Sequence, residues 1–190
     1  MYKLCKTEQS ARRQMEIEEG LLAVMQQRRY EEISVSELCQ KLNVPRKSFY
    51  RYFGSKEDAL LGLLDHRLMG YETQYNGKQT VPQRGITLRL TWFFEFWKTQ
   101  KDLLDALEHS GLSGILVQRA IHNSQRAEIF NNAPENYSKA DLEMSTGFIV
   151  CGLLSIVLQW HHDGYRQRPR EMAETAYKML SRPMVPWIEI

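Results

Sequence analysis

The sequence contains few cysteines and no recognisable catalytic or metal-binding signature. Its three cysteines, Cys5, Cys39 and Cys151, are odd in number and far apart in the 190-residue chain, which argues against a disulfide framework. No glycine-rich phosphate loop, Gly-x-Ser-x-Gly turn or Cys-x-x-Cys pair occurs. His161 and His162 are adjacent, and adjacent helical residues point about 100° apart, which suits a shared metal poorly. We therefore expect no enzyme, no metal and no other cofactor.

Long hydrophobic runs are also scarce. Residues 1–14, MYKLCKTEQSARRQ, lack the apolar core of a signal peptide. The most apolar stretch, residues 147–160, is shorter than the roughly 20 residues that a membrane-spanning helix needs. With 43% hydrophobic and 25% charged residues, the composition is that of an ordinary globular protein of one or two domains. We expect a cytoplasmic protein with no membrane partner.

Cys39 and Cys151 both fall in apolar helical patterns, so we expect buried thiols. Redox sensing by Cys5 or Cys151 is the alternative, because a lone thiol outside a disulfide framework remains available for oxidation.

The most informative pattern lies in residues 34–56, which read as two short helices joined by a tight turn. Ser34 followed three residues later by Glu37 is a capping box, which predicts that the first helix starts directly after Ser34. Asn43 tolerates the left-handed backbone angles that end a helix. Pro45 suits the first position of the next helix, so we expect the second helix to begin there.

The second short helix carries cations where helices disfavour them. Arg46 and Lys47 lie in its first turn, where the helix dipole favours anions and each cation costs a few tenths of a kcal/mol. Residues 1–56 hold 11 Lys and Arg against 7 Asp and Glu, whereas residues 57–190 hold 14 against 16. A solvated basic face is the alternative, but the spacing of the two helices favours a helix-turn-helix that reads DNA.

Residues 15–68 resemble the N-terminal DNA-binding domain of the TetR family of bacterial transcriptional repressors. The resemblance rests on the segments GLLAVMQQRRY, ISVSELCQKLNV and SFYRYFGSKEDALLGLL, the last with a Tyr-x-x-Phe-x-x-Lys-Glu core. Three residues depart from the family pattern: Arg29 and Asn43 replace glycines, and Pro45 replaces a frequent Ser or Thr. A left-handed backbone at Arg29 would cost up to about 1 kcal/mol.

The resemblance implies DNA-contacting roles for polar and cationic side chains of the two short helices. The implied base-reading residues are Arg46, Lys47 and Arg51, the implied phosphate contacts are Ser48, Tyr50, Tyr52 and Lys56, and Ser34 and Ser36 are further candidates. We expect a helix-turn-helix domain in residues 1–54 and a regulatory and dimerisation domain in residues 55–190.

Beyond the motif the periodicity is helical, so we predict an all-α fold. A helix from Ser55 to about Tyr75 leads into a loop at residues 76–85. Further helices are expected at residues 88–99, 101–109, about 112–130, from 139 onward after a Ser138–Asp141 capping box, and at 170–180.

The last two helices are expected to form a homodimer interface. Residues 147–160 are apolar nearly all round, and Gly147 and Gly152 allow close approach of another backbone. The resemblance implies that these helices and their copies form a four-helix bundle. Packing within the monomer core is the alternative.

Together these features predict a repressor that binds a palindromic operator as a homodimer and is released by an apolar or aromatic small molecule. Aromatic residues are dense in residues 92–97, although core packing competes with ligand binding there. The candidate ligand-binding residues are Trp92, Phe93, Phe96, Trp97 and His109. The alternative function is a helix-turn-helix protein whose C-terminal domain binds a protein partner.

Overall fold

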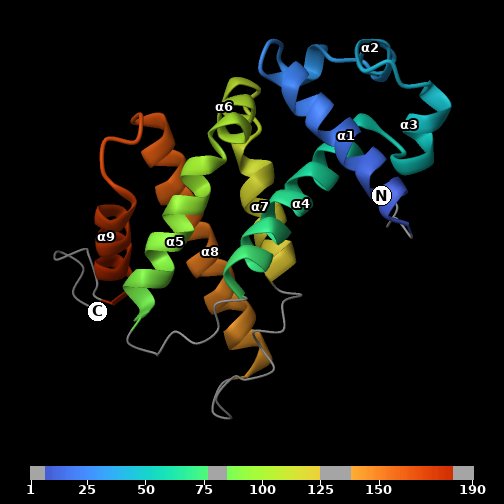
Figure 1. Cartoon of the computed structure of the whole chain (residues 1–190). Helices are drawn as coiled ribbons and strands as arrows, with labels where there is room; N and C mark the ends of the chain where they lie inside the picture. The colour runs from blue at the N-terminus through green and yellow to red at the C-terminus, as the bar shows by residue number, and fades with distance from the viewer. Residues whose placement is uncertain (1–6, 77–84, 125–137, 182–190) are drawn as a thin grey trace. The chain divides into compact units, whose positions relative to one another are not determined.

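The computed structural model describes residues 7–76, 85–124 and 138–181, and the regular structure in these ranges is entirely helical (Figure 1). This confirms the all-α prediction. The elements are α1 (Glu8–Met25), η1 (Tyr30–Glu32), α2 (Val35–Lys41), α3 (Arg46–Tyr52), α4 (Lys56–Asn76), α5 (Ile86–Thr99), α6 (Lys101–His109), α7 (Ser113–Ser124), α8 (Lys139–His162) and α9 (Pro169–Ser181).

The predicted helices are found close to their expected bounds. The predicted helix at residues 101–109 is α6, and the Ser138–Asp141 capping box before α8 is present in both directions. Most of the predicted loop at residues 76–85 and the end of the helix predicted at 112–130 lie outside the described residues, as does Cys5.

Contacts divide the chain into two compact units. The first comprises Met1–Gly70 and Asp102–Arg119, and the second comprises Tyr71–Lys101 and Ala120–Ile190. The domain boundary predicted between residues 54 and 55 stays a prediction.

The first unit is built around α1, whose apolar residues recur at helical spacing. Leu21 and Met25 of α1 are fully buried, together with Leu38 of α2 and Phe49 of α3. The rings of Phe49 and Phe53 lie 5.3 Å apart in the same core. This apolar centre fixes the two short helices of the motif to α1, which leaves their other faces for solvent or a partner.

Three consecutive residues of α4 tie it to other helices of this unit. Asp65, which is 95% buried, accepts two hydrogen bonds from the guanidinium of Arg119 in α7, one of them at 2.5 Å. His66 faces α1, and Arg67 pairs with carboxylates of α1 and α6. α4 is therefore held by charge pairs as well as by apolar packing.

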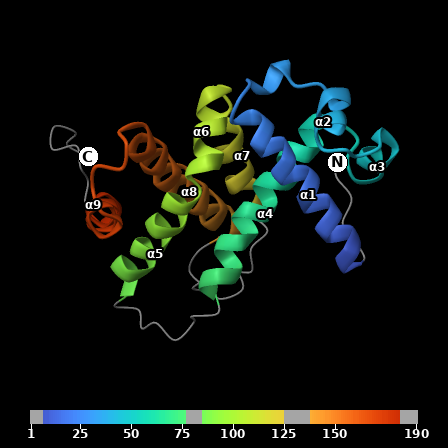
Figure 2. The ribbon, with the colours of Figure 1, turned by 45° about the horizontal axis from the view of Figure 1, so that its top comes forward.

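In the second unit α5 lies along α9 and beside α8, as both ribbon views show (Figures 1 and 2). Phe94 of α5 meets Trp160 of α8 edge to face, with ring centroids 5.7 Å apart, and both rings are buried. Gly164 and Tyr165 then adopt left-handed angles in the short turn into α9. This turn places Tyr165 on Trp160, 4.8 Å between centroids.

α8 is the most apolar helix, yet little of it is buried within the protomer. Phe148 is 77% exposed and Met144 68%, with Ile149 and Cys151 also exposed. The expectation of a buried Cys151 is therefore wrong for the protomer, whereas Cys39 is buried as predicted, and burial raises the pKa of its thiol. Among the described residues α8 alone is long and apolar enough to cross a membrane. The shortness of residues 147–160 therefore does not by itself exclude a membrane-spanning helix, because the whole of α8 is longer than that stretch.

Candidate nucleic-acid interface

The first motif helix begins as its capping box predicts. The backbone N–H of Ser34 donates to the Glu37 carboxylate at 3.1 Å, and the backbone N–H of Glu37 donates to the Ser34 hydroxyl oxygen at 3.2 Å. α2 then runs from Val35, and Asn43 closes the following turn with φ of 50°. The left-handed turn expected at Asn43 is thus confirmed.

The second motif helix starts one residue later than predicted. Pro45 has ψ of 135° and precedes the first helical residue, so α3 begins at Arg46. The reason is geometric: a proline fixes φ but not ψ, and here ψ stays extended. Arg29, where a left-handed angle would have been costly, has φ of −64° and carries no such strain.

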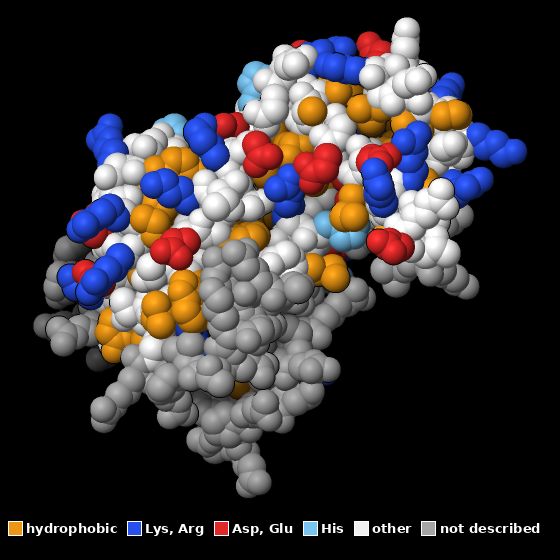
Figure 3. Space-filling view, in the orientation of Figure 1, with side chains coloured by type: hydrophobic (Ala, Val, Ile, Leu, Met, Phe, Trp, Pro, Cys, Tyr) orange, Lys and Arg blue, Asp and Glu red, His pale blue; other side chains and the backbone are white. Residues whose placement is uncertain are grey.

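α3 presents its cations to solvent. Arg46, Lys47, Tyr50 and Arg51 are exposed, and no acidic residue lies in the first turn of the helix. The Arg46 guanidinium lies 5.9 Å from the centre of the Tyr50 ring, which orients it along the outer face of the helix. Figure 3 shows Lys and Arg side chains gathered on the surface over this helix. The surface therefore has the charge and donor groups that DNA backbone and base edges require.

The other predicted contacts of the motif differ in how accessible they are. Tyr52 is 7% exposed and Ser48 is half-buried, whereas Ser36 is exposed. The Ser34 hydroxyl donates to Glu37 at 2.7 Å and is thus already engaged in the cap. The DNA-contacting roles of all these residues stay predictions.

Lys56 has a structural role that its sequence position did not reveal. Its ammonium donates to the backbone carbonyls of Tyr30 and, at 2.6 Å, Ile33, and lies 4.0 Å from the centre of the Tyr30 ring. Burial lowers the pKa of Lys56 and raises the pKa of Tyr30 to about 12. Lys56 thereby ties the segment before α2 to the start of α4, and fewer of its donors remain for a phosphate.

The predicted ligand-binding residues are mostly packed. Phe96 and Trp97 are buried, and Trp92 and Phe93 are half-buried in α5. His109 is exposed at the end of α6, in the other compact unit. Among the described residues no group of three or more His, Cys, Asp or Glu side chains is placed to hold a metal ion.

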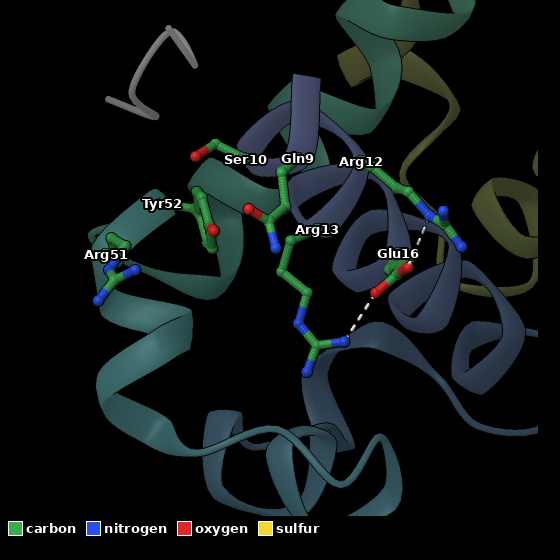
Figure 4. Close-up of a pocket in the computed structure, with 7 residues that line it drawn as sticks. All are labelled: Gln9, Ser10, Arg12, Arg13, Glu16, Arg51 and Tyr52. Atoms are coloured by element: carbon green, nitrogen blue, oxygen red, sulfur yellow. Dashed lines mark hydrogen bonds and ion pairs between the residues drawn. The ribbon is translucent and has the colours of Figure 1, made fainter. Parts of the chain in front are cut away.

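A hollow of about 480 Å³ lies beside α3, on the side toward α1, and was not predicted. Figure 4 shows side chains from both helices around it. The residues that define its chemistry are Ser10, Arg12, Arg13 and Glu16 of α1, and Arg51 and Tyr52 of α3. In the sequence, only the adjacent Arg12 and Arg13 hinted at a basic site on α1. Sequence spacing alone does not show that side chains of α1 and α3 line one hollow.

A capped first helix, a left-handed turn and an exposed cationic second helix on a common core define the helix-turn-helix class of DNA-binding proteins. Residues 19–62 match the family described as bacterial regulatory proteins, tetR family, and residues 93–182 match a transcriptional regulator C-terminal region. The chain belongs to the TetR family of transcriptional regulators, a class of DNA-binding proteins.

Individual relatives agree with this assignment. The HTH-type transcriptional regulator EthR of Mycolicibacterium smegmatis is 33% identical over 75 residues, and the match spans 37% of this chain but only 35% of that protein. A TetR regulator from Streptococcus agalactiae superposes over 92% of this chain and 96% of its own, with TM-score 0.64 and 16% identity. FadR from Bacillus subtilis, solved in complex with stearoyl-CoA, covers 87% of this chain and 96% of its own, with TM-score 0.57 and 14% identity. At such identities the two structures show similarity of fold.

Proposed function

We propose that this protein is a sequence-specific repressor that binds a palindromic operator as a homodimer and is released by an apolar or aromatic small molecule. The observation that carries the DNA-binding part is the exposed pair Arg46 and Lys47 in the first turn of α3, on a helix held to its core by buried Phe49. Cations at a helix N-terminus oppose the helix dipole, so a partner of negative charge accounts for them best.

The two cations suit guanine in particular. Arg and Lys donate to the O6 and N7 acceptors of guanine in the major groove, and a good bidentate contact contributes about 1 to 3 kcal/mol of discrimination. A two-fold dimer presents two copies of α3, so the operator consists of two inverted half-sites about one helical turn apart, or a multiple of one turn.

The dimer proposal is supported by the exposed face of α8. Phe148 and Met144 project from it, and Gly152 lies exposed one turn beyond Phe148. A Cβ added to Gly152 would meet nothing within 4 Å, so the protomer leaves open space there. α9 adds exposed Tyr177 and Leu180. Apolar side chains beside a small residue allow two helices to approach closely. The same face on a second copy would bury the apolar side chains of both protomers.

The release proposal is supported by the aromatic content of α5. Trp92 and Phe93 are half-buried, so neither residue is fully enclosed by the packed core. The Bacillus subtilis FadR, of similar fold, was solved with stearoyl-CoA, which makes long-chain acyl-CoA the first effector class to test. A ligand that favours one conformer while DNA favours another lowers operator affinity by their coupling free energy.

The deciding experiment is fluorescence anisotropy with DNA from upstream of the protein's own gene and with scrambled DNA of equal length. We expect preferential binding to the upstream fragment, and loss of that preference in Arg46→Ala/Lys47→Ala. Weak binding that is equal for both fragments and sensitive to salt would contradict the proposal.

Release is tested by thermal shift with stearoyl-CoA and simpler aromatic compounds. A specific ligand at 100 times its Kd adds about 2.7 kcal/mol of stability. A stabilising ligand that also weakens operator binding supports release. Absence of any stabilising compound, with a purified protein partner that binds the C-terminal unit, would favour the alternative of a protein-binding regulator.

A further inference from the structure

The hollow between α1 and α3 is rich in cations. Three guanidinium groups, those of Arg12, Arg13 and Arg51, surround it, and Glu16 contributes the one carboxylate. Arg13 donates to Glu16 at 2.7 Å and Arg12 lies 3.4 Å from it. The hydrogen bond from Arg13 lowers the pKa of Glu16, so this carboxylate stays ionised at neutral pH and the lining carries a net charge of about +2.

Arg51 is the cation of this group that no carboxylate neutralises. Within the described ranges Arg51 forms no ion pair, and the residue is exposed. Figure 4 shows Arg51 and Tyr52 on one side of the hollow and Arg13 on the other. Two guanidinium groups and a phenol all donate hydrogen bonds, and a phosphate group accepts several at once.

We propose that this hollow holds one backbone phosphate of the bound DNA, with Arg13 and Arg51 as its ligands. The inference rests on the proposed DNA-binding function and makes two additions to it. α1 joins the DNA interface, and Arg51 becomes a phosphate ligand, which replaces the base-reading role that the family resemblance implied.

The position of Arg51 on α3 favours DNA over a free anion. Arg46 and Arg51 are five residues apart, which corresponds to about 7.5 Å along a helix and about 140° around its axis. The two side chains therefore leave α3 in different directions. A duplex that meets Arg46 with its base edges would thus meet Arg51 with the backbone at the side of the groove, beside the arginines of α1.

The test compares full-length wild type with Arg13→Ala and Arg51→Ala, using the upstream and scrambled fragments in a KCl titration. Each neutralised phosphate contributes about 0.9 to the slope of log affinity against log salt. When KCl is raised from about 50 to about 200 mM, the affinity of each variant should therefore fall by a factor about three times smaller than the factor for wild type. Both variants should weaken binding to the two fragments by the same factor, and their effects should be non-additive because they share one phosphate.

The control is Arg170→Ala. Arg170 is an exposed helical arginine that pairs with Glu174 at 3.2 Å, much as Arg12 pairs with Glu16, and it lies in the other compact unit. It should leave the salt slope unchanged. Thermal melting of every variant separates loss of binding from loss of folding.

Several outcomes would overturn the inference. A wild-type slope in Arg13→Ala would remove α1 from the interface, and a changed fragment preference in Arg51→Ala would return that residue to base reading. Stabilisation of wild type by inorganic phosphate over KCl at equal ionic strength, absent in Arg13→Ala, would assign the hollow to a free phosphate ligand. If wild type itself shows no fragment preference, the proposed function fails, whatever the variants do.

Discussion

Glu18 and His66 join α1 to α4 through a contact of 2.5 Å between the Glu18 carboxylate and Nδ1 of the imidazole. Glu18 is 1% exposed, and its other oxygen accepts a hydrogen bond from the amide of Gln14 at 3.0 Å. A carboxylate so deeply buried is costly unless it is paired. The hydrogen bond that the His66 ring donates to Glu18 raises the pKa of His66, with further support from the charges of Glu18, Asp65 and Glu19.

The Glu18–His66 pair predicts a pH-dependent stability. A folded-state pKa above the ordinary value of about 6.5 means that the native state binds the proton more tightly than the unfolded chain does. The contribution is complete below about pH 6.5 and is lost as the pH rises through the raised folded pKa. We expect the free energy of unfolding, measured in urea, to fall as the pH rises above about 6.5, and to fall less in His66→Gln. An equal pH dependence in wild type and variant would contradict this.

Removal of Arg119 should destabilise the first unit. Asp65 is buried and accepts two hydrogen bonds from this guanidinium, so Arg119→Met removes both bonds and the opposite charge from a buried carboxylate. Loss of one partner of such a pair costs about 3 kcal/mol or more. Urea denaturation at fixed protein concentration measures this. The double variant Asp65→Asn/Arg119→Met should recover much of the loss, and a single-variant loss below about 1 kcal/mol would show that the pair contributes little.

The stability of the turn between α2 and α3 should depend on whether the residue at position 43 tolerates a left-handed backbone. Asn43 has φ of 50°, so Asn43→Val should cost about 1 to 2 kcal/mol, because a side chain branched at Cβ disfavours left-handed angles. Asn43→Gly serves as the control and should be neutral or slightly stabilising. Thermal denaturation measures both. Equal stability of the two variants would mean that the turn relaxes to another conformation.

Gly152→Leu tests the homodimer directly. A Cβ at this position would meet nothing within 4 Å among the described residues, so we expect the larger side chain to obstruct a second copy on the α8 face rather than the protomer itself. We expect light scattering at micromolar concentration to show a dimer for wild type and a weakened dimer for the variant. Gly70→Leu is the matched control, because Gly70 is also helical and also faces open space. A wild-type monomer would remove the homodimer proposal and leave the α8 face for a different partner.

Local signals predicted the motif well because they act through neighbouring residues. Ser34 and Glu37 cap α2 through contacts three residues apart, and Asn43 forms its turn through its own backbone angles. The start of α3 was displaced by one residue because Pro45 constrains only φ. Such local physics is fully present in a short stretch of sequence.

Contacts between distant residues could not be predicted in the same way. Lys56 donates to carbonyls 23 and 26 residues earlier, so its ammonium is turned inward although its position suggested a phosphate contact. The hollow beside α3 is also lined by side chains of both α1 and α3, and no spacing rule reveals that these two helices come together. Cys151 lies on an apolar helix, but the sequence could not show which side of that helix stays exposed.

The apolar face of α8 also bears on how steeply such a protein would respond to its own abundance. If a protomer with Phe148 on its surface must pair before it can hold two half-sites, the active species forms in proportion to the square of the protomer concentration below the dimer Kd. A twofold fall in copy number would then reduce that species about fourfold. The apolar side chains on this face would therefore help to set the threshold of gene control, although they belong to a different compact unit from the residues that we propose to read DNA.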